Sequence, residues 1–176
     1  MRRIFFVVML SLIASAVAYA QHFKFMGIEL DSTMNNFDVQ IKQKGFQNSK
    51  RFSSFNTSRE KWYDGFFAGY DVGLLVRSSY KTDRVYVANI FRYVSEEEAI
   101  DMTTYIKNVI KEKYVIDSII VQSPTSVRYK VGVGDIIVDY EEDSTFASEG
   151  KGYRVDIIYF DIKNNELDQE ERKSDI

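Results

Sequence analysis

Acidic side chains in the last third of the chain have a spacing that can bring carboxylates together. Residues 135–141 and 153–162 each alternate apolar with polar side chains, as half-buried strands do. If the two segments pair, Asp139 approaches Arg154 and Asp156. Carboxylates roughly 5 to 10 Å apart can hydrolyse a glycan, but Arg–Asp pairing on a wet sheet face gives the same pattern. The candidate acidic cluster is Asp135, Asp139, Glu141 and Asp156.

An aromatic segment in the middle of the chain is the second candidate site. Alternation along one strand divides its aromatic residues between two faces, with Tyr63 and Phe67 on one and Trp62, Phe66 and, if no bulge intervenes, Tyr70 on the other. A two-layer domain covers only one face of its sheet with helices. Aromatic side chains on the other face would form an exposed patch that binds a protein or a sugar. The alternative is burial of these rings beneath the helices, although both faces cannot easily be buried in a two-layer domain. We expect any binding surface among these five residues.

Other chemistries lack the residues that they need. The chain has no cysteine and a single histidine, His22, which excludes thiolate nucleophiles, Ser-His-Asp arrangements within the core and multi-histidine metal sites. The acidic run from Asp139 resembles the start of a calcium loop, but Ser144 and Gly150 occupy the positions of the required Gly and Glu. We therefore expect no metal, no cofactor and no enzymatic activity.

The first twenty residues are predicted to be a signal peptide. Arg2 and Arg3 precede an apolar run over residues 4–16, and Ala18-Tyr19-Ala20 fits a cleavage site after Ala20. We expect a periplasmic or secreted protein without a transmembrane segment in the mature chain. Without its two leading arginines the net charge becomes −5, and an acidic chain without a basic cluster is not expected to bind nucleic acid.

Two helices and several strands are predicted from periodicity and capping. Asp31 or Ser32 caps a helix over residues 33–44, and the Ser95-Glu96-Glu97-Glu98 capping box begins one over residues 96–113. The predicted strands are residues 62–71, 72–80, 84–93, 115–121, 127–131, 135–141 and 153–162, with a loop over residues 142–152. Residues 163–176 are charged and are expected to form a solvated, frayed tail.

This order of elements predicts one α+β domain over residues 21–162. Its two layers are an antiparallel sheet and the helices packed on it. Arg84-Val85 and Arg154-Val155 begin similar strands, which suggests two α-β-β-β repeats, residues 21–93 and 94–162. A single sheet without repeats explains the pattern equally well.

Several short motifs resemble those of a family of small secreted bacterial proteins of unknown function. The residues that carry the resemblance are Phe25-Met26-Gly27-Ile28-x-Leu30-Asp31, Lys44-Gly45-Phe46, Gly65-x-Phe67-Ala68-Gly69-Tyr70, Lys111-x-Lys113-Tyr114, Gly134-x-Ile136 and Val155-x-Ile157-x-Tyr159-x-Asp161. Val115-Ile116 departs from the Gly-x-Pro that the family tends to have there. The order of elements is also distantly similar to the fold of β-lactamase-inhibitory protein and the outer-membrane assembly lipoproteins. The second resemblance implies a binding or scaffold role, whereas the first family has no settled function.

The sequence thus predicts an exported, non-enzymatic binding or interaction module. Its expected partner is another envelope or secreted protein, or a glycan. Two alternatives stay open. One is a glycan-acting hydrolase or sugar-binding protein that uses the acidic residues near Asp139 and Asp156. The other is a structural component of an envelope assembly.

Overall fold

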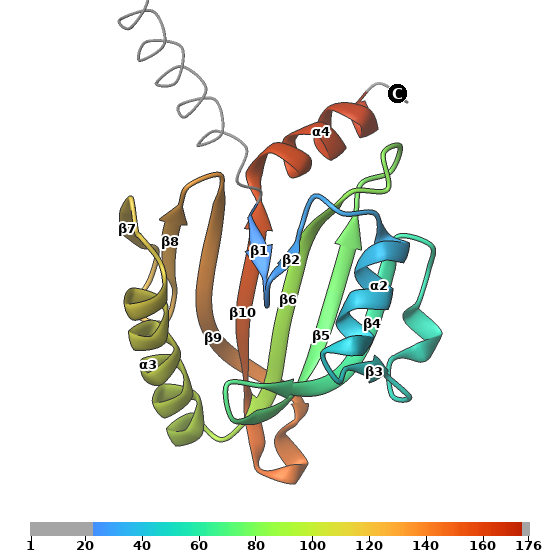
Figure 1. The fold of residues 1–176 in the computed structure, drawn as a ribbon. Coiled ribbons are helices and arrows are strands. Elements are labelled where there is room, and N and C mark those ends of the chain that lie inside the picture. Colours follow the sequence, from blue (N-terminus) through green and yellow to red (C-terminus); the bar gives the residue numbers. More distant parts are fainter. Residues whose placement is uncertain (1–22, 174–176) are drawn as a thin grey trace, which may run out of the picture.

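The computed structural model describes residues 23–173, which form a large antiparallel sheet with helices packed on it (Figure 1). The predicted signal peptide over residues 1–20, its cleavage position after Ala20 and His22 lie outside the described residues. Among residues 23–173, no helix has both the length and the apolar character needed to cross a bilayer. The predicted α+β class, with helices on an antiparallel sheet, is confirmed.

Eight strands make up the sheet, and each runs antiparallel to its neighbours. In order across the sheet they are β3 (Gln47–Asn48), β4 (Glu60–Phe67), β5 (Tyr70–Ser78), β6 (Val85–Val94), β10 (Lys151–Asp161), β9 (Gly134–Phe146), β8 (Val127–Val131) and β7 (Ser118–Val121). The central strands β6 and β10 are therefore far apart in sequence.

One face of the sheet is covered by two helices and a small hairpin. The helices are α2 (Met34–Gln43) and α3 (Glu96–Lys113), and the hairpin of β1 (Lys24–Phe25) and β2 (Ile28–Glu29) lies between them (Figure 1). Phe25 reaches the sheet from this hairpin, with its ring centroid 5.1 Å from that of Tyr159. This layer closes the main hydrophobic core.

Strand alternation decides which side chains enter that core. On β10, Val155, Ile157 and Tyr159 are buried beneath the helix layer, as the period-2 pattern predicts. Their neighbours on β6 include Ala88 and Ile90, which are also fully buried. The intervening β10 residues point to the other face of the sheet.

The two halves of the chain have the same order of elements. α2 precedes β3, β4, β5 and β6, and α3 precedes β7, β8, β9 and β10. The halves meet where β6 pairs with β10, at partners such as Ile90 and Ile157. Each half contains one strand more than the predicted α-β-β-β unit. That the halves are sequence repeats stays a prediction.

The capping box of α3 is confirmed. The Ser95 hydroxyl accepts a hydrogen bond from the Glu98 backbone N–H at 3.3 Å, and the Glu98 carboxylate accepts one from the Ser95 N–H at 3.3 Å. At α2 the predicted caps are wrong, because Thr33 caps that helix through the Asn36 N–H. Ser32 instead continues alongside β6, where its carbonyl accepts from the Val85 N–H at 2.9 Å.

Two predicted strand boundaries are also wrong. The strand expected over residues 62–71 ends at Phe67, and the chain turns through Ala68 (φ 50°) and Gly69 (φ 94°) before β5 begins at Tyr70. Two consecutive positive φ angles are typical of a tight hairpin turn. The loop expected over residues 142–152 is largely strand, because β9 continues to Phe146 and a 3₁₀ turn, η2 (Ala147–Glu149), leads into β10.

The frayed tail expected from residue 163 is replaced by a helix, α4 (Ile162–Lys173), at one end of the sheet (Figure 1). The buried Asp168 accepts a hydrogen bond from the Tyr80 N–H at 2.8 Å, and Arg172 donates to the same carboxylate. Asn164 donates to Asp31 at 2.9 Å. The charges that suggested a solvated tail are partly used to attach the helix.

Removing the α3 cap tests how strongly this helix depends on it. In Ser95→Ala, we expect the free energy of unfolding to fall by about 1 kcal/mol, because the Glu98 N–H loses its hydroxyl acceptor. Urea denaturation measures the change. Ser148→Ala, in the exposed η2 turn, should leave the value unchanged. Equal losses in the two variants would contradict a specific role for the cap.

Candidate functional site

The candidate site lies on the open face, the face of the sheet opposite α2 and α3. Strand register places one row of residues across five neighbouring strands of this face. In order from β4 to β9, the Cα partners are Asp64, Gly73, Phe91, Asp156 and Asp139. The aromatic and the acidic candidates, which are far apart in sequence, therefore belong to one continuous surface.

An aromatic cluster occupies the β4–β6 part of the open face. Its members are Phe52, Phe55, Trp62, Phe91, Tyr93 and Phe146. Trp62 and Phe91 meet edge to face with centroids 5.5 Å apart, and Phe52 lies 5.0 Å from Trp62. Such pairs contribute stabilisation beyond burial alone. The cluster attaches the segment containing the 3₁₀ turn η1 (Ser53–Phe55) to the sheet.

Gly73 makes room for this cluster. A Cβ atom built at Gly73 would lie 2.2 Å from Cζ of Phe91, which is too close for any larger residue without movement of the ring. The Phe91 ring therefore lies directly over the β5 backbone, and only 3% of the residue is exposed.

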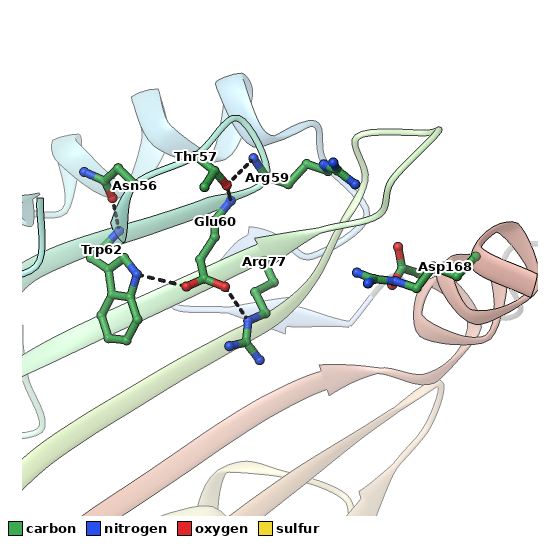
Figure 2. A network of polar contacts seen from close by, with 8 residues as sticks. Asn56, Thr57, Arg59, Glu60, Trp62, Arg77 and Asp168 are labelled. Carbon is green, nitrogen blue, oxygen red and sulfur yellow. Dashed lines mark hydrogen bonds and ion pairs between the residues drawn. The ribbon is translucent and has the colours of Figure 1, made fainter. Parts of the chain in front are cut away.

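A polar network fixes the orientation of Trp62 (Figure 2). The indole N–H donates to one oxygen of Glu60 at 3.1 Å, and Nε of Arg77 donates to the other at 2.8 Å. The Trp62 backbone N–H donates to Asn56 Oδ1 at 2.8 Å. Thr57 Oγ1 accepts from the N–H groups of Arg59 and Glu60. The tryptophan is thus held by the loop before β4 and by the neighbouring strand.

Two arginines contact the rings of the aromatic cluster, and one of them, Arg154, also binds an acidic residue. The Arg51 guanidinium lies 3.7 Å from the ring centroid of Phe146. Arg154 lies 5.2 Å from the Phe91 centroid and donates from Nη2 to Asp156 at 2.8 Å. Arginine on an aromatic face gains from the quadrupole of the ring and keeps some of its N–H groups available for other acceptors.

The acidic cluster is divided between two environments. Asp135 is fully buried and pairs with Arg128, whose Nε donates to it at 2.7 Å. Asp139 and Asp156 lie directly opposite each other on β9 and β10, as the hairpin prediction requires. Glu141 lies opposite Arg154 and is exposed. Asp139, Glu141 and Asp156 of the predicted cluster therefore lie together. Asp135 instead forms an ion pair with Arg128.

Burial and mutual repulsion perturb the two opposed carboxyls. Burial raises the pKa of Asp156, although Arg154 and the Asn89 amide, which donates at 2.8 Å, act in the other direction. The pKa of Asp139 is raised first by burial and then by the negative charges of Glu141 and Asp156. Among the described residues, Asn89 Oδ1 and Arg154 Nε are buried without a hydrogen-bond partner. Buried polar groups without a partner require a specific explanation, and a role in a functional site is one of them.

The structure separates the five predicted aromatic residues. Trp62 and Phe66 lie on the open face, where 60% of Phe66 is exposed. Tyr63 is buried on the opposite face, and its hydroxyl donates to Asp38 at 2.8 Å. Phe67 stacks on Phe25 of the core layer. Tyr63 and Phe67 therefore contribute to the core and not to an exposed patch.

The predicted position of Tyr70 beside Trp62 and Phe66 is wrong. Because the chain turns at Ala68 and Gly69, Tyr70 is the Cα partner of Phe67 and shares its face. The Tyr70 ring contacts Tyr105 of α3, with centroids 6.5 Å apart.

Other members of the site were not predicted. Phe52 and Phe55 lie in the segment before β4, for which the predicted elements include neither helix nor strand, and Phe91, Tyr93 and Phe146 belong to other strands. Aromatic residues inside polar segments are a usable signal, but the contacts between them depend on strand order across the sheet. Periodicity does not provide that order.

A pocket of about 710 Å³ opens beside the aromatic cluster. Aromatic rings in its wall include Phe66, Phe91 and Phe146, and charged residues of both signs surround them: Lys50, Arg51, Asp64, Asp71, Arg92 and Lys151. Trp62, Asp139 and Asp156 are not in its wall, but Phe52 and Phe91, which pack against Trp62, are. A cavity with aromatic walls and charged margins can bind an amphipathic ligand such as a protein side chain.

Within residues 23–173, no group of three or more His, Cys, Asp or Glu side chains is arranged to hold a metal ion.

Comparisons of the chain with protein-family models, with curated proteins and with solved structures found no match. The function must therefore be inferred from the open face itself.

Replacing Asp139 by asparagine tests the electrostatics of this face. The pKa of Asp139 is higher in the folded protein than the ordinary value of 3.8. As the pH rises from 3.8 to the pKa of the folded protein, the unfolded chain loses this proton more readily, so the free energy of unfolding falls. We therefore expect Asp139→Asn to be more stable than the parent protein at neutral pH and equally stable well below pH 3.8. Urea denaturation across this pH range measures the difference.

Asp143 provides a control of opposite sign. Hydrogen bonds from Thr145 lower its pKa, so Asp143→Asn should give no gain at neutral pH and a slight loss. If Asp139→Asn were less stable than the parent protein at neutral pH, the charged Asp139 carboxylate would be stabilised by its neighbours. That result would contradict a raised pKa.

Proposed function

We propose that this protein is an exported, non-enzymatic module that binds another protein through the aromatic cluster and pocket of the open face. The observation that carries the proposal is the immobilised Trp62. Its indole N–H is held by Glu60 at 3.1 Å, and its ring packs against Phe52 and Phe91. A prearranged aromatic surface loses little conformational entropy when a partner binds.

The composition of the surface supports a protein partner. Tryptophan, tyrosine and arginine dominate the energetics of protein interfaces, and they tend to cluster at the centre of the contact. Trp62, Tyr93, Arg51 and Arg154 lie in or beside the aromatic cluster. Charged residues at the pocket margin would form a polar rim around this centre.

The rings contact one another mainly by their edges. Trp62 meets Phe91 at 78° and Tyr93 meets Phe146 at 74°. A sugar ring needs an open aromatic face on which to stack, and here Phe52 and Arg51 lie against two of these rings. This geometry favours protein side chains over a glycan as the ligand.

A hydrolase at the acidic residues has weaker support. Asp139 and Asp156 have raised pKa values, as a general acid requires. However, the pocket beside the cluster includes neither residue. One oxygen of Asp156 already accepts hydrogen bonds from both Asn89 and Arg154. These contacts stabilise a charge network on a binding face.

Fluorescence can test the proposal because Trp62 is the single tryptophan of the chain. We expect its emission to change when the protein is titrated with envelope-protein peptides and to stay constant with soluble glycans. Arg51→Ala and Phe66→Ser should each weaken the best peptide about thirtyfold, the effect of losing a central interface residue. Val39→Ser, at an exposed position of α2, should bind like the parent protein.

Two results would contradict the proposal. One is a peptide that binds without changing Trp62 emission and equally well to Arg51→Ala and Phe66→Ser. The other is a response to glycans alone, which would favour the sugar-binding alternative.

A further inference from the structure

The two edges of the sheet differ in how they are protected. At one edge, β3 has two residues, Gln47 and Asn48, and both are polar. At the other, β7 has four residues, and Ile119, Ile120 and Val121 are 50%, 40% and 70% exposed. Natural edge strands usually carry lysine, proline or a bulge that prevents further pairing. β7 has neither lysine nor proline along its length, and its irregularity is confined to its first residue, where the Asp117 N–H donates to the carbonyl of Lys130, the Cα partner of Ser118, at 2.9 Å.

The charged neighbour of β7 does not protect the edge. Asp117 accepts a hydrogen bond from the Gly132 N–H at 2.7 Å, which draws its carboxylate toward the turn between β8 and β9. After β7, Gln122 and Ser123 are neutral. The residues that follow the exposed apolar part of β7 are therefore polar but carry no charge that would repel a second strand.

Backbone hydrogen bonding shows which groups of β7 are available. The Gln122 N–H donates to the Ser126 carbonyl at 3.0 Å, in register with the Val121–Val127 pair. Antiparallel ladders alternate, so the even-numbered residues of β7 direct their backbone groups toward β8. The N–H and C=O groups of Ile119 and Val121 point away from the sheet.

We propose that β7 pairs with β7 of a second copy of this chain, antiparallel and about a twofold axis, to form one continuous sheet. A twofold axis normal to the sheet keeps each side chain on its own face of the sheet. Odd-numbered residues can therefore lie opposite only odd-numbered residues of the partner, and even-numbered opposite even-numbered. The register centred on Ile120 places Ile119 opposite the partner's Val121 and Ser118 opposite the partner's Gln122. Apolar residues thus meet apolar ones, and polar residues meet polar ones.

Only this register uses all the available backbone groups of the strand. Ile119 and Val121 each exchange two hydrogen bonds with the partner chain, which makes four across the axis. If the register were centred on Ile119, Val121 would lie opposite the partner's Asp117, which is outside β7. Only two hydrogen bonds, those between the two Ile119 residues, would then join one β7 to the other. The self-complementary pattern is what selects a second copy as the occupant of the edge.

The layers of the fold leave space for this pairing. Ile119 is the Cα partner of the buried Tyr129, so Ile119 and Val121 lie on the same face as α3. That helix packs mainly on β9 and β10, and β7 lies at the outer margin of the sheet (Figure 1). Pairing would bury these exposed side chains against their counterparts. Because the contact is one strand wide, we expect a weak, reversible dimer.

Cysteine cross-linking tests the pairing, since the chain has no cysteine of its own. At the axis, Ile120 faces its counterpart in a non-hydrogen-bonded pair about 4.5 Å apart at Cα, a separation that a disulfide can bridge. The two Ser118 residues, on the same strand and face, would be roughly 14 Å apart. We expect Ile120→Cys to oxidise to a covalent dimer about tenfold faster than Ser118→Cys, because the axis holds its thiols together.

Sedimentation equilibrium supplies an independent readout. Parent protein should show a concentration-dependent dimer, and Ile120→Lys should be monomeric because two lysines would face each other at the axis. Val39→Lys, an equally exposed substitution on α2, should dimerise like the parent, with thermal unfolding confirming that both variants fold. Equal oxidation rates for the two cysteine variants, or a parent protein that stays monomeric at the highest concentrations, would overturn the proposal.

Discussion

The pairing of β6 with β10 is the contact on which the rest of the structure depends. It joins the two halves of the chain in the middle of the sheet, with Ile90 opposite Ile157 inside the core. On the open face the same pairing places Phe91 beside Asp156 and Tyr93 beside Arg154. Both the core and the candidate site are therefore consequences of one long-range register. A slip of one residue would exchange the two faces.

Covering the sheet on one side imposes a constraint on its other side. With α2 and α3 on the core face, the open face must be held by contacts among its own side chains and by the segment around η1. It uses edge-to-face rings, arginine on aromatic rings and an ion pair at Asp156. A buried ion pair contributes little net stability, because desolvation offsets the attraction between the charges. The Arg154–Asp156 pair is therefore expected to add little net stability to the open face.

Local patterns predicted the parts of the fold that local physics determines. The capping box at Ser95 located the start of α3, and alternation around Ile157 identified the core face of β10. The turn at Ala68 and Gly69 was missed because a positive φ at alanine has no clear sequence signal. α4 was missed because the charges of Asp168 and Arg172 indicated solvent exposure, whereas the structure uses them as anchors.

The candidate site was predictable only in part. Trp62 and the opposed Asp139 and Asp156 were identified from alternation, and the structure places them on one face. Phe52 and Phe146 were not identified, because their contribution depends on strand order and on a loop that folds over the sheet. The spacing of residues along the chain does not predict that β6 pairs with β10.

Neighbouring residues at the end of β4 allow a direct measurement of the division between the two faces. Phe66 is 60% exposed on the open face, and Phe67 stacks on Phe25 in the core layer. Because Phe67 is only partly buried, in urea denaturation we expect Phe67→Ala to lower the free energy of unfolding by about 2 kcal/mol. Phe66→Ala should change it by less than about 0.5 kcal/mol. Equal losses, or a larger loss for Phe66→Ala, would contradict the division of the sheet into a covered core face and an open face.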